Sequence, residues 1–181
     1  MRPIPSLCGW YVPSVADDPL THFDEAGAAR IVAIDEKPET PRAATARARV
    51  RMAEATLQRI ESGAVGKGDV LSVARLAAIG AAKGTSGLIP LCHPVRLTSV
   101  DVDFAILRDL PGVEARVTVR AVDRTGPEME AMVAASTAGL TIYDMCKAMD
   151  RGMEILEVAL LSKSGGKSGQ WTRESSPGAT T

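Results

Sequence analysis

The stretch of sequence that decides the fold is VDVDFAILRDLPGVEARVTVRA, residues 100–121. Apolar and polar residues alternate along both halves of this stretch, and a period of two residues is typical of a half-buried β-strand. Pro111 and Gly112 separate the halves, as a tight connection between antiparallel strands requires. The stretch therefore predicts a β-hairpin.

Further strands and helices are expected on both sides of this hairpin. Alternation predicts strands over residues 42–52 and 155–161, helical spacing predicts helices over 54–62, 70–83 and 128 to about 150, and a short apolar run suggests an edge strand over 30–35. The core order is βαββαβ, with an extra helix before the first helix. This order predicts an α+β, ferredoxin-like sandwich in which helices cover one face of an antiparallel sheet. The other face would need a cover, and self-association is the simplest one.

The helix expected over residues 70–83 has small side chains along one face. Asp69 is well placed to cap its N-terminus. Helical periodicity predicts a shared face made of Val70, Val73, Ala74, Ala77 and Ala81. These small side chains would allow close packing.

Composition excludes several classes of protein. The 181 residues include 21 Lys and Arg against 22 Asp and Glu, which gives a net charge of −1. This balance argues against a general nucleic-acid-binding or membrane-surface protein. Aromatic residues make up only 3% of the chain, too few for a platform that stacks bases. No apolar run reaches the roughly 18 residues of a spanning helix.

The chain is expected to form one domain with two tails, and to lie in the cytoplasm. Four prolines make residues 1–20 a flexible arm, residues 21–173 form the domain, and residues 174–181 are a polar tail. The three cysteines contain no C-x-x-C pair, and the N-terminus lacks the apolar segment of a signal peptide. With only two histidines, no metal site is expected.

Two glycine-rich segments carry lysines that can bind an anion. Lys67 lies in GAVGKGD, where backbone N–H groups and a following helix can hold a phosphate, although a plain turn between helices is the alternative. Lys163 and Lys167 lie in KSGGKSG, which is no Walker A motif. This second segment is either a flexible basic loop that closes over a polyanion or a solubilising tail.

Titratable residues elsewhere allow a functional and a structural interpretation. His93 follows Cys92 in a proline-bounded apolar segment, and it is either an acid, base or phosphate donor or a structural histidine. Glu128 and Glu130 open the long helix, where carboxylates stabilise the helix dipole and can also accept from the donor edge of a guanine-like base.

Asp144 and Lys147 lie three residues apart on the same helix. They form either a surface ion pair or, because the residues around them are apolar, a proton-transfer pair with shifted pKa values. The collection of lysine loops, one histidine and three acids indicates a small polyphosphate ligand rather than a polymer.

Seven short strings occur in a fixed order between residues 21 and 172: THF, KPET, VGKGD, LIPLCHP, GPEMEAM, LTIYDMCKA and LLSKSGGKSG. In these strings the chain closely resembles the molybdenum cofactor biosynthesis protein C family. The resemblance implies a cyclic pyranopterin monophosphate synthase, a lyase that rearranges a cyclised guanosine triphosphate and releases pyrophosphate. It also implies a ferredoxin-like fold, no cofactor, and a homohexamer built as a trimer of dimers with active sites at the dimer interface.

The resemblance also assigns the site residues. It implies a catalytic pair, Asp144 and Lys147, and a substrate-binding set of Arg42, Lys67, Cys92, His93, Glu128, Glu130 and Lys163. By physical role, the basic residues would hold the triphosphate, the glutamates would engage the ring, and the pair would transfer protons. The alternatives are a nucleotide-sensing binding module of the same fold without catalysis and a structural oligomerisation domain. A binding module would not need the Asp144 and Lys147 pair.

Overall fold

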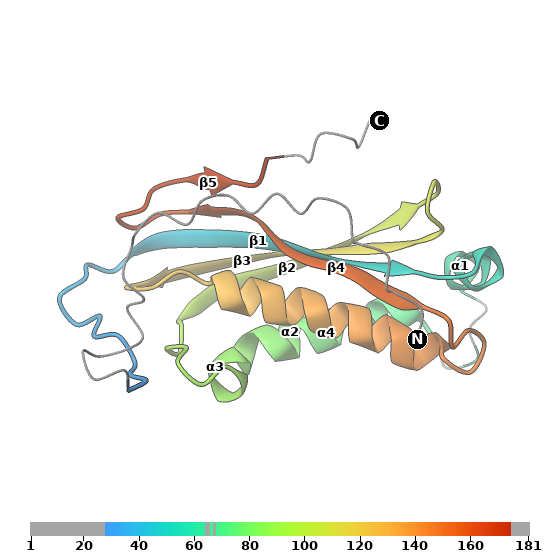
Figure 1. Cartoon of the computed structure of the whole chain (residues 1–181), viewed down its shortest axis with the longest axis horizontal. Coiled ribbons are helices and arrows are strands. Elements are labelled where there is room, and N and C mark those ends of the chain that lie inside the picture. Colours follow the sequence, from blue (N-terminus) through green and yellow to red (C-terminus); the bar gives the residue numbers. More distant parts are fainter. Residues whose placement is uncertain (1–27, 64–65, 67, 175–181) are drawn as a thin grey trace, which may run out of the picture. The chain divides into compact units, whose positions relative to one another are not determined.

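The computed structural model describes residues 28–63, 66 and 68–174. The chain divides into two units, Met1–Val32 and Ala33–Thr181, and every helix and strand named below belongs to the second. In this unit helices cover one face of a single sheet (Figure 1). Residues 1–27, 64–65, 67 and 175–181 lie outside the described residues, and with them the N-terminal arm, Lys67 and nearly all of the C-terminal tail.

The sheet has five strands in the order β2-β3-β1-β4-β5, and every neighbouring pair is antiparallel. The strands are β1 (Thr40–Arg51), β2 (Leu97–Leu107), β3 (Gly112–Asp123), β4 (Glu154–Ser164) and β5 (Trp171–Thr172). The predicted hairpin is the pair β2 and β3. The ferredoxin-like α+β arrangement is confirmed, with β5 added at one edge.

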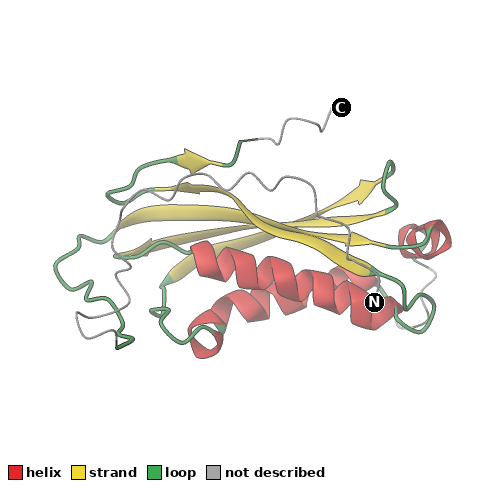
Figure 2. Ribbon diagram, in the orientation of Figure 1, coloured by secondary structure: helices red, strands yellow, loops and turns green. Residues whose placement is uncertain are grey.

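Four helices accompany the sheet: α1 (Glu54–Glu61), α2 (Val70–Lys83), α3 (Thr85–Leu88) and α4 (Glu128–Cys146). The long helices α2 and α4 pack against each other and lie along the same face of the sheet (Figure 2). The Asp69 side chain caps α2 as predicted, because it accepts a hydrogen bond from the Ser72 amide at 3.0 Å.

Three details differ from expectation. Residues 30–35 form no strand, and the two edges of the sheet belong to β2 and β5. The helix expected to reach about residue 150 ends at Cys146, because the Asp150 carboxylate accepts hydrogen bonds from the Ala53 and Gly152 amides and holds the chain in a turn. The short elements α3 and β5 were not predicted, since two to four residues show no measurable period.

Small side chains fill the space between the helices and the sheet. Helix α2 buries every fourth residue, so Val73, expected in the core, is 40% exposed. Gly139 of α4 lies against β1, and a Cβ at this position would be 3.4 Å from Val50 Cγ2. The buried small residues include Ala44, Ala46 and Ala48 of β1, Ala115 and Ala121 of β3, Ala74, Ala78 and Ala82 of α2, and Ala131, Ala134, Ala135 and Ala138 of α4.

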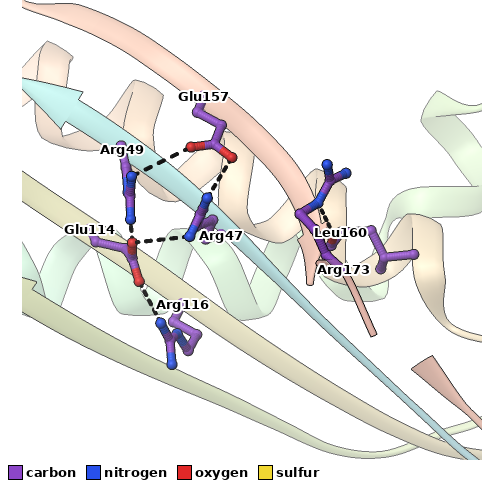
Figure 3. Close-up of polar contacts among 7 residues, drawn as sticks. All are labelled: Arg47, Arg49, Glu114, Arg116, Glu157, Leu160 and Arg173. Carbon is purple, nitrogen blue, oxygen red and sulfur yellow. Dashed lines mark hydrogen bonds and ion pairs between the residues drawn. The ribbon is translucent and has the colours of Figure 1, made fainter. Parts of the chain in front are cut away.

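A ladder of five charged residues crosses the other face of the sheet (Figure 3). We call Arg47, Arg49, Glu114, Arg116 and Glu157 the charge ladder. Glu114 is its centre: Oε2 accepts from Arg49 Nε at 2.8 Å and Oε1 from Arg116 Nη2 at 2.8 Å, while Arg47 bridges to Glu157 at 2.7 Å. The Glu114 side chain is only 6% exposed, so its charge depends on these arginines.

The strand β5 is fastened to β4 beside the ladder. Arg173 Nε donates to the Leu160 carbonyl at 2.7 Å, and the Arg173 amide donates to the Leu161 carbonyl at the same distance (Figure 3). The Arg173 guanidinium also lies over the Trp171 ring. The chain beyond KSGGKSG therefore returns to the sheet rather than leaving it.

The ladder predicts a pH-dependent contribution to stability. Burial raises the pKa of Glu114, but hydrogen bonds from Arg49 and Arg116 outweigh burial and hold this pKa below its usual value. A carboxyl with a depressed folded pKa stabilises the protein above its unfolded pKa, and that contribution is lost as pH falls through the folded pKa. Glu114→Gln should therefore lower the free energy of unfolding by about 1–3 kcal/mol at neutral pH. The difference from wild type should vanish in acid.

Urea unfolding between neutral and acidic pH measures this difference at a fixed protein concentration. Glu154→Gln is the matched control, because its partner Arg51 and Glu154 itself are both about half exposed. Its effect should stay below about 1 kcal/mol. A loss in Glu114→Gln that is the same at every pH would contradict the ion-pair explanation.

Candidate active site

The candidate residues gather at the two ends of α4. Glu128 and Glu130 lie in its first turn, whereas Asp144 lies in its last turn and Lys147 forms its C-cap. Asp144 lies sixteen positions after Glu128, which is about 24 Å along a helix axis. We call the region around Glu128 and Glu130 the glutamate end and the region around Lys147 the lysine end. One chain therefore does not bring all the predicted residues together.

An ion pair joins α4 to β4 at the glutamate end. Lys163 Nζ lies 3.2 Å from Glu128 Oε1, and both side chains are about one third exposed. Lys163 belongs to β4, where it pairs with Trp171 of β5, so it is not part of a flexible loop. A Cβ at Gly126 would overlap the Glu128 carboxylate, so the carboxylate occupies space that any side chain at position 126 would fill.

Arg42, near the start of β1, lies beneath the glycine turn that follows β4. Its Nε donates to the Asp123 carbonyl at 2.8 Å. Gly165 and Gly166 have φ angles of 95° and 68°, in the left-handed region that favours glycine. A Cβ at Gly166 would also overlap the Arg42 guanidinium. Because these two glycines have no side chains, the backbone of KSGGKSG packs directly against Arg42.

Glu130 and Cys92 form a buried acidic contact at the same end. Glu130 is 2% exposed, and Cys92 Sγ lies 3.8 Å from its Oε1. Within the described residues Oε2 has no hydrogen-bond partner, although it is buried. Burial raises the pKa of Glu130, and burial followed by the charge of Glu130 raises the pKa of the Cys92 thiol. Both groups therefore hold their protons more strongly than usual.

The pair at the lysine end lies in a different environment. Lys147 Nζ is 2.6 Å from Asp144 Oδ1, and the two side chains are 53% and 61% exposed. The hydrogen bond that Lys147 donates to Asp144 raises the pKa of Lys147. The apolar surroundings expected from the sequence do not cover the pair in a single chain, because Ile142 and Cys146 face the core. The ion pair keeps Lys147 charged.

One remaining candidate, His93, and one further residue, Asp123, belong to the glutamate end. His93 follows Cys92 in the loop between α3 and β2 and is partly exposed. Asp123, which sequence reasoning missed, accepts from the amides of Arg96 and Arg124 at the end of β3 and so fixes the strand end that binds Arg42. Its only sequence signal is an acid directly after an alternating strand.

Metal ligands do not gather in the part of the chain that the structure describes, since no group of three or more His, Cys, Asp or Glu side chains there could hold an ion. Of the helices described, none is long and apolar enough to cross a membrane.

The chain is similar to known proteins over a range that includes both ends of α4. The MoaC family model matches residues 31–166. A relative named cyclic pyranopterin monophosphate synthase from Heliobacterium modesticaldum is 54% identical over 157 residues, which cover 87% of this chain and 99% of the relative. A relative of the same name from Thermomicrobium roseum is 54% identical over 155 residues, 86% of this chain and 93% of that protein. The chain therefore belongs to the MoaC family.

Proposed function

We propose that this chain is a cyclic pyranopterin monophosphate synthase of molybdenum cofactor biosynthesis. It would act as a phosphorus–oxygen lyase on a cyclised guanosine triphosphate and release pyrophosphate. The observation that carries the proposal is the 54% identity, over nearly the full length of both proteins, to relatives with this name. A cytoplasmic location and a reaction without a cofactor belong to the same proposal.

The glutamate end has the charges that a triphosphate and a purine-derived ring require. The Arg42 guanidinium can bind phosphate oxygens through two parallel hydrogen bonds, and Lys163 supplies a point charge once it exchanges Glu128 for phosphate. Lys67 and His93 are assigned to the same phosphates. Buried carboxyl oxygens at Glu130, together with Glu128, would accept hydrogen bonds from N–H groups of the ring.

The lysine end would supply the proton transfers. In one chain Lys147 is exposed and paired with Asp144, so its ammonium is a poor base. Burial against another surface disfavours the charged form of a lysine and lowers its pKa. A second copy that covers this end would provide such burial and make Asp144 and Lys147 an effective acid and base.

The separation of the two ends supports a site shared between subunits. A ring bound at the glutamate end of one chain would lie about 24 Å along α4 from the Asp144 and Lys147 pair of the same chain, too far for direct proton transfer. In a dimer with two-fold symmetry, the lysine end of one copy can meet the glutamate end of the other. We therefore infer that the active site lies at a dimer interface, within a homohexamer that is a trimer of dimers.

Turnover is tested by incubating the purified protein with the cyclised guanosine triphosphate and detecting pyrophosphate together with the cyclic pterin. Lys147→Ala should form no product, because it removes the proton-transfer amine, and should still bind the substrate. Arg108→Ala is the control, since the ion pair of Arg108 is with Glu61 of α1 and involves none of the candidate site residues. Substrate binding without product in the wild-type protein would instead favour a nucleotide-sensing module.

A shared site predicts complementation between inactive variants. Lys147→Ala and Lys163→Ala, co-expressed with different tags, should regain up to about half of the wild-type activity in verified mixed dimers, because one of the two sites then has both ends intact. Arg42→Ala mixed with Lys163→Ala is the control and should regain nothing, since each site then lacks one cation. Equal activity in both mixtures would contradict a site built from two chains.

The glycine turn predicts a contact-specific loss of substrate binding. Gly166→Ala should raise KM about tenfold or more, a loss of about 1.4 kcal/mol, because the new Cβ displaces Arg42 from the phosphates. Gly169→Ala is the matched control: Gly169 has a φ of 66°, close to that of Gly166, and nothing lies within 4 Å of a Cβ there. The KM of Gly169→Ala, measured by steady-state kinetics, should stay near the wild-type value. An equal rise in both variants would assign the effect to backbone strain.

A further inference from the structure

The contact between Cys92 and Glu130 assigns a role to the cysteine that differs from direct substrate binding. We propose that Cys92 is a positioning residue, whose thiol holds Oε1 of Glu130 and leaves Oε2 to accept an N–H of the ring. This inference rests on the proposed function for the identity of the ring, but the contact itself can be measured without substrate.

The sulfur lies between the carboxyl group and the backbone of its own loop. Cys92 Sγ is 3.8 Å from Glu130 Oε1 and 3.6 Å from the His93 carbonyl oxygen. A thiol is a weak donor with one hydrogen and a weak acceptor. Both neighbours are acceptors, so the one hydrogen serves only one of them at a time. Donated to Glu130, it fastens the first turn of α4 to the loop that carries His93 and leaves the second carboxyl oxygen unoccupied.

A hydrogen-bond donor on a ligand would gain the most binding free energy by pairing with Oε2, the second carboxyl oxygen of Glu130. A buried acceptor without a partner costs about 1–3 kcal/mol, which a donor from the substrate would recover. Within the described residues Oε2 is such an acceptor. Because Oε1 is already engaged by Cys92, the orientation of Oε2 is fixed before the substrate arrives.

The charges around Glu130 come from three elements. Glu128 of α4 and Asp123 of β3 both add negative charge, and Cys92 contributes the thiol from the loop before β2. Lys163 of β4 is paired with Glu128, and Asp123 is held by the Arg96 and Arg124 amides. Burial is the largest influence and raises the pKa of Glu130, whereas the backbone amide of Glu130 itself and then the hydrogen bond from Cys92 lower it.

The contact is tested first by the alkylation of Cys92 with iodoacetamide as a function of pH, with peptide mass spectrometry to separate Cys92 from the other two cysteines. Only the thiolate reacts, and Glu130 holds the proton on the thiol. Glu130→Gln should accelerate alkylation at pH 8 by about threefold or more. Glu128→Gln is the matched acid without a hydrogen bond to Cys92, and its effect should be smaller. Identical rates in all three proteins would overturn the contact.

The positioning role is tested by the pH dependence of kcat/KM. Cys92→Ala removes the donor, so the pKa of Glu130 rises and the acid limb of the profile should move to higher pH. Cys92→Ser restores a donor and should return the limb to the wild-type position or below it. A purely structural cysteine would lower stability in both variants and leave the limb in place, which would overturn the proposal.

The two proposals fail in different ways. A wild-type protein that forms no product overturns the proposed function, and with it the role of Oε2, whatever the alkylation rates show. Normal turnover with an unmoved acid limb in Cys92→Ala overturns the positioning role alone.

Discussion

The close approach of α4 to β1, made possible by alanine and glycine side chains, is the constraint on which the rest of the structure depends. Ala46 and Ala48 of the strand and Ala135, Ala138 and Gly139 of the helix are buried with almost no side-chain volume between the backbones. Packing at this density leaves little freedom to slide or tilt. The first turn of α4 is thereby held beside the end of β4 and the loop before β2, which is where Lys163 and Cys92 meet its glutamates.

The two ends of α4 differ in how their charges are satisfied. At the glutamate end a buried acid, an ion pair and a glycine-covered guanidinium are fixed by the sheet, so their geometry exists before any ligand binds. At the lysine end an exposed ion pair joins the last helical turn to the C-cap residue. One end is organised by its own chain, whereas the pair at the other end is exposed in a single chain, and burial against another surface would lower the pKa of its lysine.

The sequence predicted the four long strands, the hairpin and the βαββαβ order, because alternation with a period of two is a strong signal, but it wrongly expected a strand over 30–35 and missed β5. It misassigned Val73 to the core, since alanine-rich helices show little contrast between faces. The end of α4 depends on Asp150 contacting a distant amide, and no local pattern records that contact. The site residues could be predicted from sequence motifs. The distance between the two ends of α4 and the contact of Gly166 with Arg42 could not, because both depend on how distant segments pack together.

An unbroken helix of 19 residues separates the two ends, and this sets a strict limit on change by insertion or deletion. One added residue within α4 would turn everything after it by about 100° and advance it by about 1.5 Å. The alanine face would then point away from the sheet, and the Asp144 and Lys147 pair would face a new direction. The outer surface of α4 can therefore tolerate substitutions, whereas the number of residues in the helix must stay the same.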